Sequence, residues 1–262
     1  MILKLSSSSI KQFKACRRAY QFRKVYNVVP AVVSEALETG SNYHEMLETL
    51  TKTGTLPELD SKESAMVIAY SKFILPDMPK FEPEVEFEIS FGKNNVLTGR
   101  LDGLTNDGKA VIEHKTTSLS IEEYEFNLQW DEQLLTYFVA TGCRHAFYTI
   151  CRKPTIRQKQ TETAEEFAQR CLEWYNEETY SKIAMLEITH TDAEVCEHKK
   201  QLQKMFSEIR KAHNSNNFYR NSCNCTAWGR PCEYKQICMN YDPDKEYIGF
   251  KRREDYADNK NI

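Results

Sequence analysis

Residues 99–116 read GRLDGLTNDGKAVIEHKT, and they contain two strand-like segments on either side of a turn. Asn106-Asp107-Gly108-Lys109 is typical of a β-hairpin turn, because Asn, Asp and Gly tolerate the backbone conformations that tight turns require. The pattern predicts strands over residues 96–105 and 109–116. With Asp107-Gly108 as a two-residue loop, counting outward places Asp102 directly opposite Glu113.

Three charged side chains of this hairpin share one face of the predicted sheet. The Cβ atoms of Asp102 and Glu113 would lie about 5 Å apart, and Lys115 is two residues beyond Glu113. Two opposed carboxylates repel unless a cation lies between them, and carboxylates suit a hard ion such as Mg²⁺ or Mn²⁺. Such an ion can acidify a water and stabilise charge on a phosphoryl oxygen. The lysine can orient that water or neutralise the transition state.

The rest of the chain combines helical and strand patterns around this hairpin. Apolar residues spaced three or four apart predict helices, and apolar–polar alternation predicts strands. The expected helices cover residues 8–24, 34–53, 60–75, 120–141, 163–176 and 191–213, and further strands cover 84–91, 145–152 and 182–189. We expect an α/β protein with one domain over residues 1–240. It comprises a helical part (1–80), a core (84–190) and a helix with a cysteine cluster (191–240), followed by a charged tail (241–262).

The composition is that of a folded chain. Its 262 residues carry a formal net charge of −3, and they include only 9 Gly and 8 Pro, with 11 % aromatic residues. These values exclude a collagen-like or mostly disordered protein. No apolar run approaches the ~20 residues of a membrane span, and the first residues lack the apolar core of a signal peptide. We therefore expect a cytoplasmic protein with no membrane partner.

The segments Gly99–Gly103 and Val111–Thr116 resemble the core of the PD-(D/E)XK nucleases, and most closely the RecB-like branch. The proline of the family's name is Leu101 here. The resemblance implies a restriction-endonuclease-like core, in which helices flank a mixed central sheet. It also implies a metal-dependent deoxyribonuclease that hydrolyses phosphodiester bonds. By the same resemblance Asp102 and Glu113 bind the metal and Lys115 serves the attacking water.

Other segments extend the resemblance. Gly40–Glu45 is similar to a G-x-x-x-H motif whose His is a further metal ligand, here His44, and the main-chain carbonyl of His114 is implied as another ligand. Gln133-x-x-x-Tyr137 resembles a motif that contacts the nucleic acid. The alternative for His44 is an ordinary histidine without a ligand role. The alternative for the second motif is an ordinary core stripe formed by Trp130, Gln133, Leu134 and Tyr137. Glu86 resembles a family glutamate on the preceding strand, but Glu84 and Glu88 share its face, and a solvated surface is the favoured interpretation.

Nine cysteines are many for a chain without a secretory signal, where clustered thiols indicate a metal more often than disulfides. Cys225-x6-Cys232-x5-Cys238, with Cys16 far upstream, resembles the iron–sulfur staple of RecB-like exonucleases. Phage-encoded members, CRISPR-adaptation exonucleases and AddB-type nucleases share that staple. The resemblance implies a [4Fe–4S] cluster that ties the chain ends together. Cys223 competes with Cys225 for one position. A four-cysteine Zn²⁺ site and unrelated buried thiols are the alternatives.

Residues 1–34 contain seven basic side chains and no acidic one, and local basic surface can bind phosphates. These residues are Lys4, Lys11, Lys14, Arg17, Arg18, Arg23 and Lys24. We expect Arg17 and Arg18 to contact DNA, although a solvated helix face explains the same pattern. The function we expect is an exonuclease of phage type acting on single-stranded DNA or DNA ends, in the bacterial host cytoplasm, with recombination or replication proteins as further partners. The alternatives are a non-catalytic nucleic-acid-binding protein on this fold, or a zinc-stabilised interaction protein.

Overall fold

The computed structural model describes residues 2–128, 131–229, 231–242 and 244–253. The chain forms two compact units, each built from separate segments. We call the first the cysteine unit (Met1–Val33, Phe87–Gly99 and Glu197–Ile262) and the second the sheet unit (Ser34–Glu86 and Arg100–Cys196). Strands β3 (Phe81–Ser90) and β4 (Asn95–Thr105) run through both.

The sheet unit contains the expected mixed sheet. Its strands lie in the order β4, β5 (Ala110–Thr117), β6 (His145–Arg152) and β7 (Ile183–Thr189), and β3 pairs with the other edge of β4. The β4–β5 and β6–β7 pairs are antiparallel, whereas β5 and β6 are parallel. A parallel step needs a crossover connection, which α5 (Ile121–Leu128) and α6 (Glu132–Thr141) supply. The predicted α/β class and the flanked mixed sheet are confirmed.

The hairpin turn differs from the prediction in length but not in register. Four residues, 106–109, separate the two strands, because Thr105 Oγ1 accepts the Ala110 N–H at 2.9 Å and the Gly108 N–H bonds to the Thr105 carbonyl at 2.7 Å. Gly108 has a φ of 69°, a left-handed conformation that suits glycine. Gly103 pairs with Ile112, so the predicted register is confirmed.

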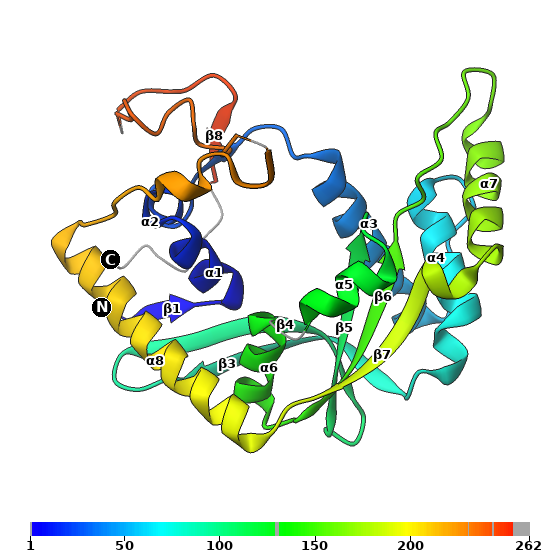
Figure 1. Cartoon of the computed structure of the whole chain (residues 1–262), viewed down its shortest axis with the longest axis horizontal. Helices are drawn as coiled ribbons and strands as arrows, with labels where there is room; N and C mark the ends of the chain where they lie inside the picture. The colour runs from blue at the N-terminus through cyan, green and yellow to red at the C-terminus, as the bar shows by residue number, and fades with distance from the viewer. Residues whose placement is uncertain (1, 129–130, 230, 243, 254–262) are drawn as a thin grey trace. The chain divides into compact units, whose positions relative to one another are not determined.

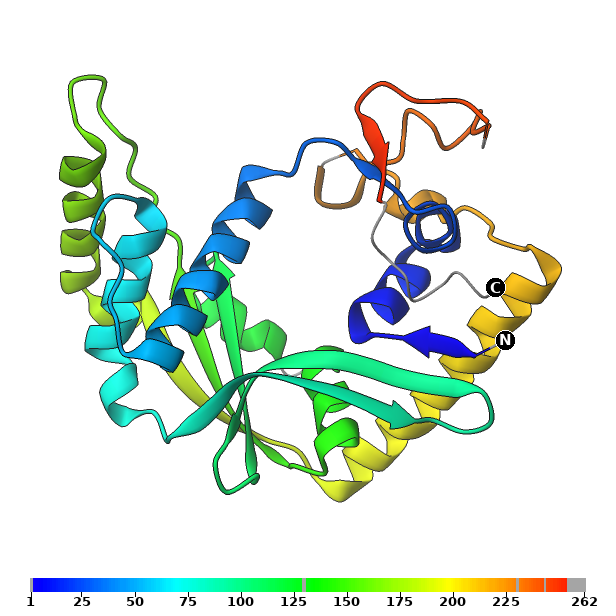
Figure 2. The ribbon, with the colours of Figure 1, turned by 180° about the vertical axis from the view of Figure 1, so that it is seen from behind.

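Helices cover both faces of this sheet (Figures 1 and 2). α3 (Glu35–Thr53), α4 (Lys62–Phe73) and α7 (Ala164–Asn176) share a core that includes Tyr43, Tyr70 and Tyr175. Adjacent side chains of a strand point to opposite faces. On β5 the His114 ring lies 5.3 Å from the Tyr70 ring of α4, whereas Lys115 contacts Gln133 of α6. α4 and α6 therefore cover opposite faces.

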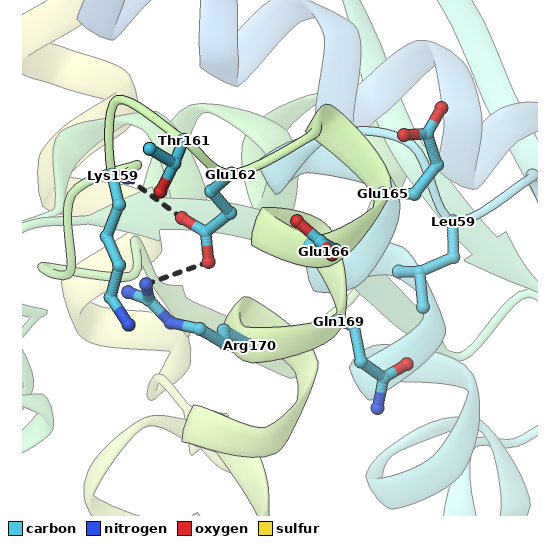
Figure 3. Close-up of a pocket in the computed structure, with 8 residues that line it drawn as sticks. All are labelled: Leu59, Lys159, Thr161, Glu162, Glu165, Glu166, Gln169 and Arg170. Carbon is cyan, nitrogen blue, oxygen red and sulfur yellow. Dashed lines mark hydrogen bonds and ion pairs between the residues drawn. The ribbon is translucent and has the colours of Figure 1, made fainter.

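The loop before α7 is held by its own side chains and by side chains of α7 (Figure 3). Thr163 and Glu166 form a reciprocal capping box, and this is why the helix begins at Ala164. Glu162 accepts a bond from the Lys159 backbone at 2.9 Å and pairs with Arg170 at 2.8 Å.

The expected single helix over 120–141 is wrong. The structure shows α5 ending at Leu128 and α6 beginning at Glu132. The side chain of Asp131 accepts the Gln133 N–H at 2.9 Å and so caps a new helix. Trp130 lies outside the described residues.

The cysteine unit joins strands from distant parts of the chain. β1 (Leu3–Leu5) runs parallel to the first residues of β4, and β2 (Val28–Pro30) pairs with β8 (Phe250–Arg252). Phe91 stacks on Phe206 of α8 (Asp192–Ser215) with 5.3 Å between ring centroids. Within the described part of the chain, none of the helices has the length and apolar character to cross a membrane.

The expected helix over 8–24 is also wrong, because it breaks at Cys16. α1 (Ser7–Ala15) ends there, and α2 (Arg17–Tyr20) continues into a π-helix over Gln21–Val25. The Asn221 side chain donates to the Ala15 carbonyl at 2.9 Å, and the Asn221 N–H points at the Cys16 sulfur at 3.5 Å. The carbonyl at the end of α1 is thus bonded by a residue about 200 positions away along the chain.

Candidate active site

Asp102 and Glu113 lie where β4 and β5 stop pairing. Beyond the Gly103–Ile112 pair the ladder ends, and the His114 N–H donates to Oδ2 of Asp102 at 2.7 Å instead of to a β4 carbonyl. The Glu113 side chain is only 1 % exposed. Its Oε1 contacts the Lys115 ammonium, while its buried Oε2 has no hydrogen-bond partner among the described residues. A buried carboxylate oxygen without a partner is costly, so this oxygen indicates a missing ligand.

The electrostatics of the pair are those of a cation site. Burial raises the pKa of both carboxyls, and the Asp102 charge raises the pKa of Glu113 further. Burial alone would lower the pKa of Lys115, but Glu113 and Asp102 beside it raise that pKa overall. Lys115 therefore keeps its positive charge and cannot act as a general base in this state.

A chain of hydrogen bonds holds Lys115 in place. Its ammonium donates to Oε1 of Gln133 at 3.1 Å. The Gln133 amide donates to the Tyr137 hydroxyl at 2.6 Å, and that hydroxyl donates to the Arg100 carbonyl at 3.0 Å. The Gln-x-x-x-Tyr pair of α6 thus connects Lys115 to β4, two residues before Asp102. Asp131, which the sequence did not single out, caps α6 and accepts a bond from Tyr148 at 3.0 Å.

His44 reaches Asp102 from α3. Its Nδ1 lies 3.5 Å from Oδ1 of Asp102, and one ligand atom each from His44, Glu84 and Asp102 lie within 4.8 Å of one another. Burial lowers the pKa of His44, which favours the neutral imidazole that binds metals. One imidazole and two carboxylates form a suitable donor set for Mg²⁺ or Mn²⁺.

Glu84, not Glu86, is the glutamate of β3 that reaches this group. Glu84 has a φ of 56°, which breaks the alternation of the strand, and its side chain is 11 % exposed. It pairs with the Arg100 guanidinium at 2.5 Å, whereas Glu86 is exposed. The available sequence signal was Pro83, since proline within a strand marks an edge or an irregularity.

The His114 ring points to the opposite face from Glu113 and Lys115. Its Nδ1 lies 2.7 Å from the Thr149 hydroxyl, and burial lowers the pKa of His114 to about 3. The Phe81 ring lies 6.1 Å from it and covers Gly103 so closely that a side chain at position 103 would overlap the ring. The ring is therefore a packed core group, and only the main chain of His114 faces Asp102.

A comparison with protein families identifies the superfamily of the chain. The model of the PD-(D/E)XK nuclease superfamily matches residues 4–73 and 61–239. The chain belongs to the PD-(D/E)XK nuclease superfamily. Members of this superfamily use Mg²⁺ or Mn²⁺, so the chain is a hydrolytic, metal-dependent nuclease by family.

Solved structures resemble the chain at low sequence identity. A proposed exonuclease from Eubacterium rectale is 14 % identical with a TM-score of 0.54, covering 94 % of this chain and 90 % of that one. A phage-related exonuclease from Haemophilus somnus (12 % identity, TM-score 0.39, 81 % and 97 % covered) is more distant. An alkaline exonuclease from Laribacter hongkongensis is also more distant, with 14 % identity and a TM-score of 0.37, covering 81 % of this chain and 93 % of that one. No curated protein matches the nuclease.

Glu84 gives a direct test of the metal site. We expect Glu84→Gln to weaken Mn²⁺ binding about 10- to 100-fold, the range for groups that support a metal. Glu86→Gln, on the same strand but exposed, is the matched control and should bind Mn²⁺ like the wild type. Isothermal titration on the metal-free protein measures both. Equal affinities for the two variants would remove Glu84 from the site.

The two arginines expected at the DNA make contacts within the protein. The Arg17 guanidinium pairs with Glu208 at 2.8 Å and lies between the Phe13 and Tyr219 rings. Arg18 donates to Gln21 and lies 4.8 Å from the Phe22 ring. These contacts stabilise the cysteine unit, and a DNA contact by either residue stays a prediction.

Two thiols of the cysteine unit, Cys232 and Cys238, are influenced by Cys16 and Cys225. Burial raises the pKa of the Cys232 and Cys238 thiols, and the thiols of Cys16 and Cys225 raise both further. Cys223 is exposed. In the described residues no three thiols lie within 4.8 Å of one another. The described residues therefore do not show a metal-cluster site formed by these thiols.

Proposed function

We propose that this nuclease hydrolyses phosphodiester bonds in DNA as an exonuclease acting on single strands or DNA ends. The observation that carries the proposal is the buried Oε2 of Glu113, which has no hydrogen-bond partner among the described residues although it lies beside the Asp102 carboxylate and the Lys115 ammonium. We assign the chain to the RecB-like branch, of phage type, as one functional module over residues 1–240. Recombination or replication proteins are the proposed further partners.

Each residue has a defined part in this mechanism. Asp102, Glu113 and His44 would hold Mg²⁺ or Mn²⁺, with Glu84 and the His114 carbonyl as further donors. When bound, the ion stabilises charge on the phosphoryl oxygens and acidifies a water. The Lys115 ammonium would orient that water or neutralise the charge that develops in the transition state. Gln133 and Tyr137 keep the ammonium beside Glu113.

The test is degradation of end-labelled single-stranded DNA in Mn²⁺, Mg²⁺ or EDTA. Asp102→Ala should abolish metal-dependent cleavage, and exposed Glu86→Gln should keep it. A circular single strand distinguishes an exonuclease from an endonuclease, because an exonuclease needs a free DNA end and cannot start on a circle. Equal cleavage by the wild type and Asp102→Ala would place the chemistry elsewhere. DNA binding without cleavage by folded wild type would favour the non-catalytic module.

We further propose that Cys16, Cys225, Cys232 and Cys238 hold a [4Fe–4S] cluster with a structural role. Two observations support this: the Cys16 and Cys225 thiols raise the pKa of Cys232 and of Cys238, and Cys232 and Cys238 pack against a core of Phe22, Val28, Tyr234 and Ile237. Phosphodiester hydrolysis requires no electron transfer, so the cluster would join the two ends of the chain.

Colour distinguishes the cluster from zinc. We expect anaerobically purified protein to be brown, with a band near ~400 nm, whereas a Zn²⁺ protein is colourless because its d shell is full. Cys225→Ser should lose iron and the band, and Cys223→Ser, two residues away and exposed, should keep both. The opposite result would make Cys223 the ligand, and zinc without iron would overturn the cluster.

A further inference from the structure

β7 is the last strand of the sheet, and no strand within the described residues pairs with its outer edge. On its inner side the Arg152 N–H bonds to the Lys182 carbonyl at 2.8 Å, and the His190 N–H bonds to the Arg144 carbonyl at 3.0 Å. Groups that face the partner alternate along an antiparallel strand. The backbone N–H and C=O groups of the even-numbered residues of β7 therefore point toward β6. The backbone N–H and C=O groups of Ile183, Met185 and Glu187 point outward. The described residues offer these groups no hydrogen-bond partner.

A groove of about 880 Å³ follows this open edge. Four consecutive residues, Ile183–Leu186, line it. Side chains alternate between the faces of a strand, so a groove that touches all four runs along the edge. The other walls come from the end of α4 with the 3₁₀ turn η2 (Leu75–Asp77), the start of α5, and the 3₁₀ turn η3 (Thr179–Ser181). An added strand would find both backbone partners and space for its side chains.

The charges around the groove have one sign. Its lining includes four exposed carboxylates and no lysine or arginine, and none of the four forms an ion pair with a described residue. These residues are Asp77, Glu122, Glu125 and Glu178. The phosphates of DNA would be repelled here. A second copy of this edge would bring four more carboxylates against the first four, so a basic segment is the complementary occupant.

The rim of the groove is fixed before anything binds. Glu178 has a φ of 48° and directly precedes η3, whose Ser181 donates to the Glu178 carbonyl from both its N–H (3.0 Å) and its hydroxyl (2.8 Å). The buried Lys182 ammonium ties this turn to the end of α7 through the Trp174 carbonyl at 2.7 Å. Tyr180 remains 90 % exposed at the rim. A rigid rim lowers the entropy cost of binding, and an exposed tyrosine is a typical anchor at interfaces.

We propose that the outer edge of β7 and its acidic groove bind an extended segment of a partner protein, which carries alternating basic and apolar side chains and adds as a further strand. Main-chain hydrogen bonds to Ile183, Met185 and Glu187 would fix the register of the added strand against β7. The four carboxylates would select the basic side chains of the partner. None of the groove residues belongs to the candidate active site, so this binding can be measured without DNA cleavage.

The experiment uses the full chain and fluorescein-labelled ten-residue peptides that alternate Lys with Val, Leu or Phe. Matched peptides carry Glu in place of Lys, or N-methyl groups at alternate positions. We expect the Lys peptides to bind by anisotropy and to slow hydrogen exchange at Ile183, Met185 and Glu187. Glu122→Lys/Glu125→Lys should weaken binding at least tenfold. The control Glu58→Lys/Glu173→Lys makes the same charge change outside the groove and should bind like the wild type.

Several results would overturn the proposal. These are equal binding of the Glu and Lys peptides, binding that survives N-methylation, no selective protection of the three amides, or equal loss in the control variant. Protection of the same amides that rises with protein concentration alone would show that a second copy covers the edge. Protection of the same amides by single-stranded DNA alone, without peptide, would make the groove a nucleic-acid site instead. None of these readouts depends on nuclease activity.

Discussion

Lys115→Met is expected to lower DNA cleavage at least ~10²-fold, the usual loss when one preorganised charge-stabilising group is removed. The ammonium contacts Glu113 and Gln133 and stays protonated, so Met removes its charge while keeping a similar length. The variant also leaves Glu113, which is 1 % exposed, without its cation. We expect the free energy of unfolding of the metal-free protein to fall by about 2–3 kcal/mol. That is less than the ~3–5 kcal/mol for a fully buried pair, because Lys115 is a quarter exposed.

Two further variants make this result specific. Glu113→Gln combined with Lys115→Met removes both charges and should recover most of the lost stability, without recovering cleavage. Lys109→Met, on the same hairpin but 82 % exposed, is the matched control and should leave both cleavage and stability unchanged. Chemical denaturation and a single-turnover assay measure the two effects separately. Full cleavage by Lys115→Met would exclude this lysine from the chemistry.

The sequence predicted the active-site hairpin well because residues within the hairpin itself determine its strands and its turn. Alternation and the Asn-Asp-Gly turn define the two strands, and the register follows from counting outward from the turn. The loop is four residues instead of two, yet the register is unchanged, because lengthening a loop by one residue on each side preserves the pairing. Asp102 and Glu113 could therefore be placed together from residues 99–116 alone.

Where the sequence failed, distant contacts decide the structure. The helix over 8–24 breaks at Cys16 because Asn221 bonds to the Ala15 carbonyl, and no pattern within 8–24 contains that partner. The helix over 120–141 divides because the Asp131 side chain caps α6, although a helical stripe continues through it. Glu84 reaches Asp102 only because its left-handed backbone breaks the alternation of β3. Each incorrect prediction concerns a segment that contains a proposed ligand or a residue that positions one. In these segments tertiary contacts override the local preference for helix or strand.

Asp102→Asn is expected to separate metal binding from folding. The Asn side-chain oxygen can still accept the His114 N–H, which now bonds to Oδ2 of Asp102 at 2.7 Å. The substitution also removes a mostly buried negative charge beside Glu113. The metal-free variant should therefore unfold at the same temperature as the metal-free wild type, or higher. An alanine at this position would lose the hydrogen bond as well, so Asn gives the cleaner measurement.

The effect of Asp102→Asn appears when metal is added. Mn²⁺ at 100 times its dissociation constant should stabilise the wild type by ~2.7 kcal/mol, which is about 5–10 °C in melting temperature for a chain of this size. A 100-fold loss of affinity in Asp102→Asn would leave ~0.4 kcal/mol, or about 1 °C, at the same concentration. Asp107→Asn changes an exposed carboxylate of the same hairpin and should keep the full shift, even if its turn is weaker. A full Mn²⁺ shift in Asp102→Asn would mean that the ion binds elsewhere. A lower melting temperature without metal would mean that the Asp102 charge supports the fold itself, through Lys115, rather than serving the ion.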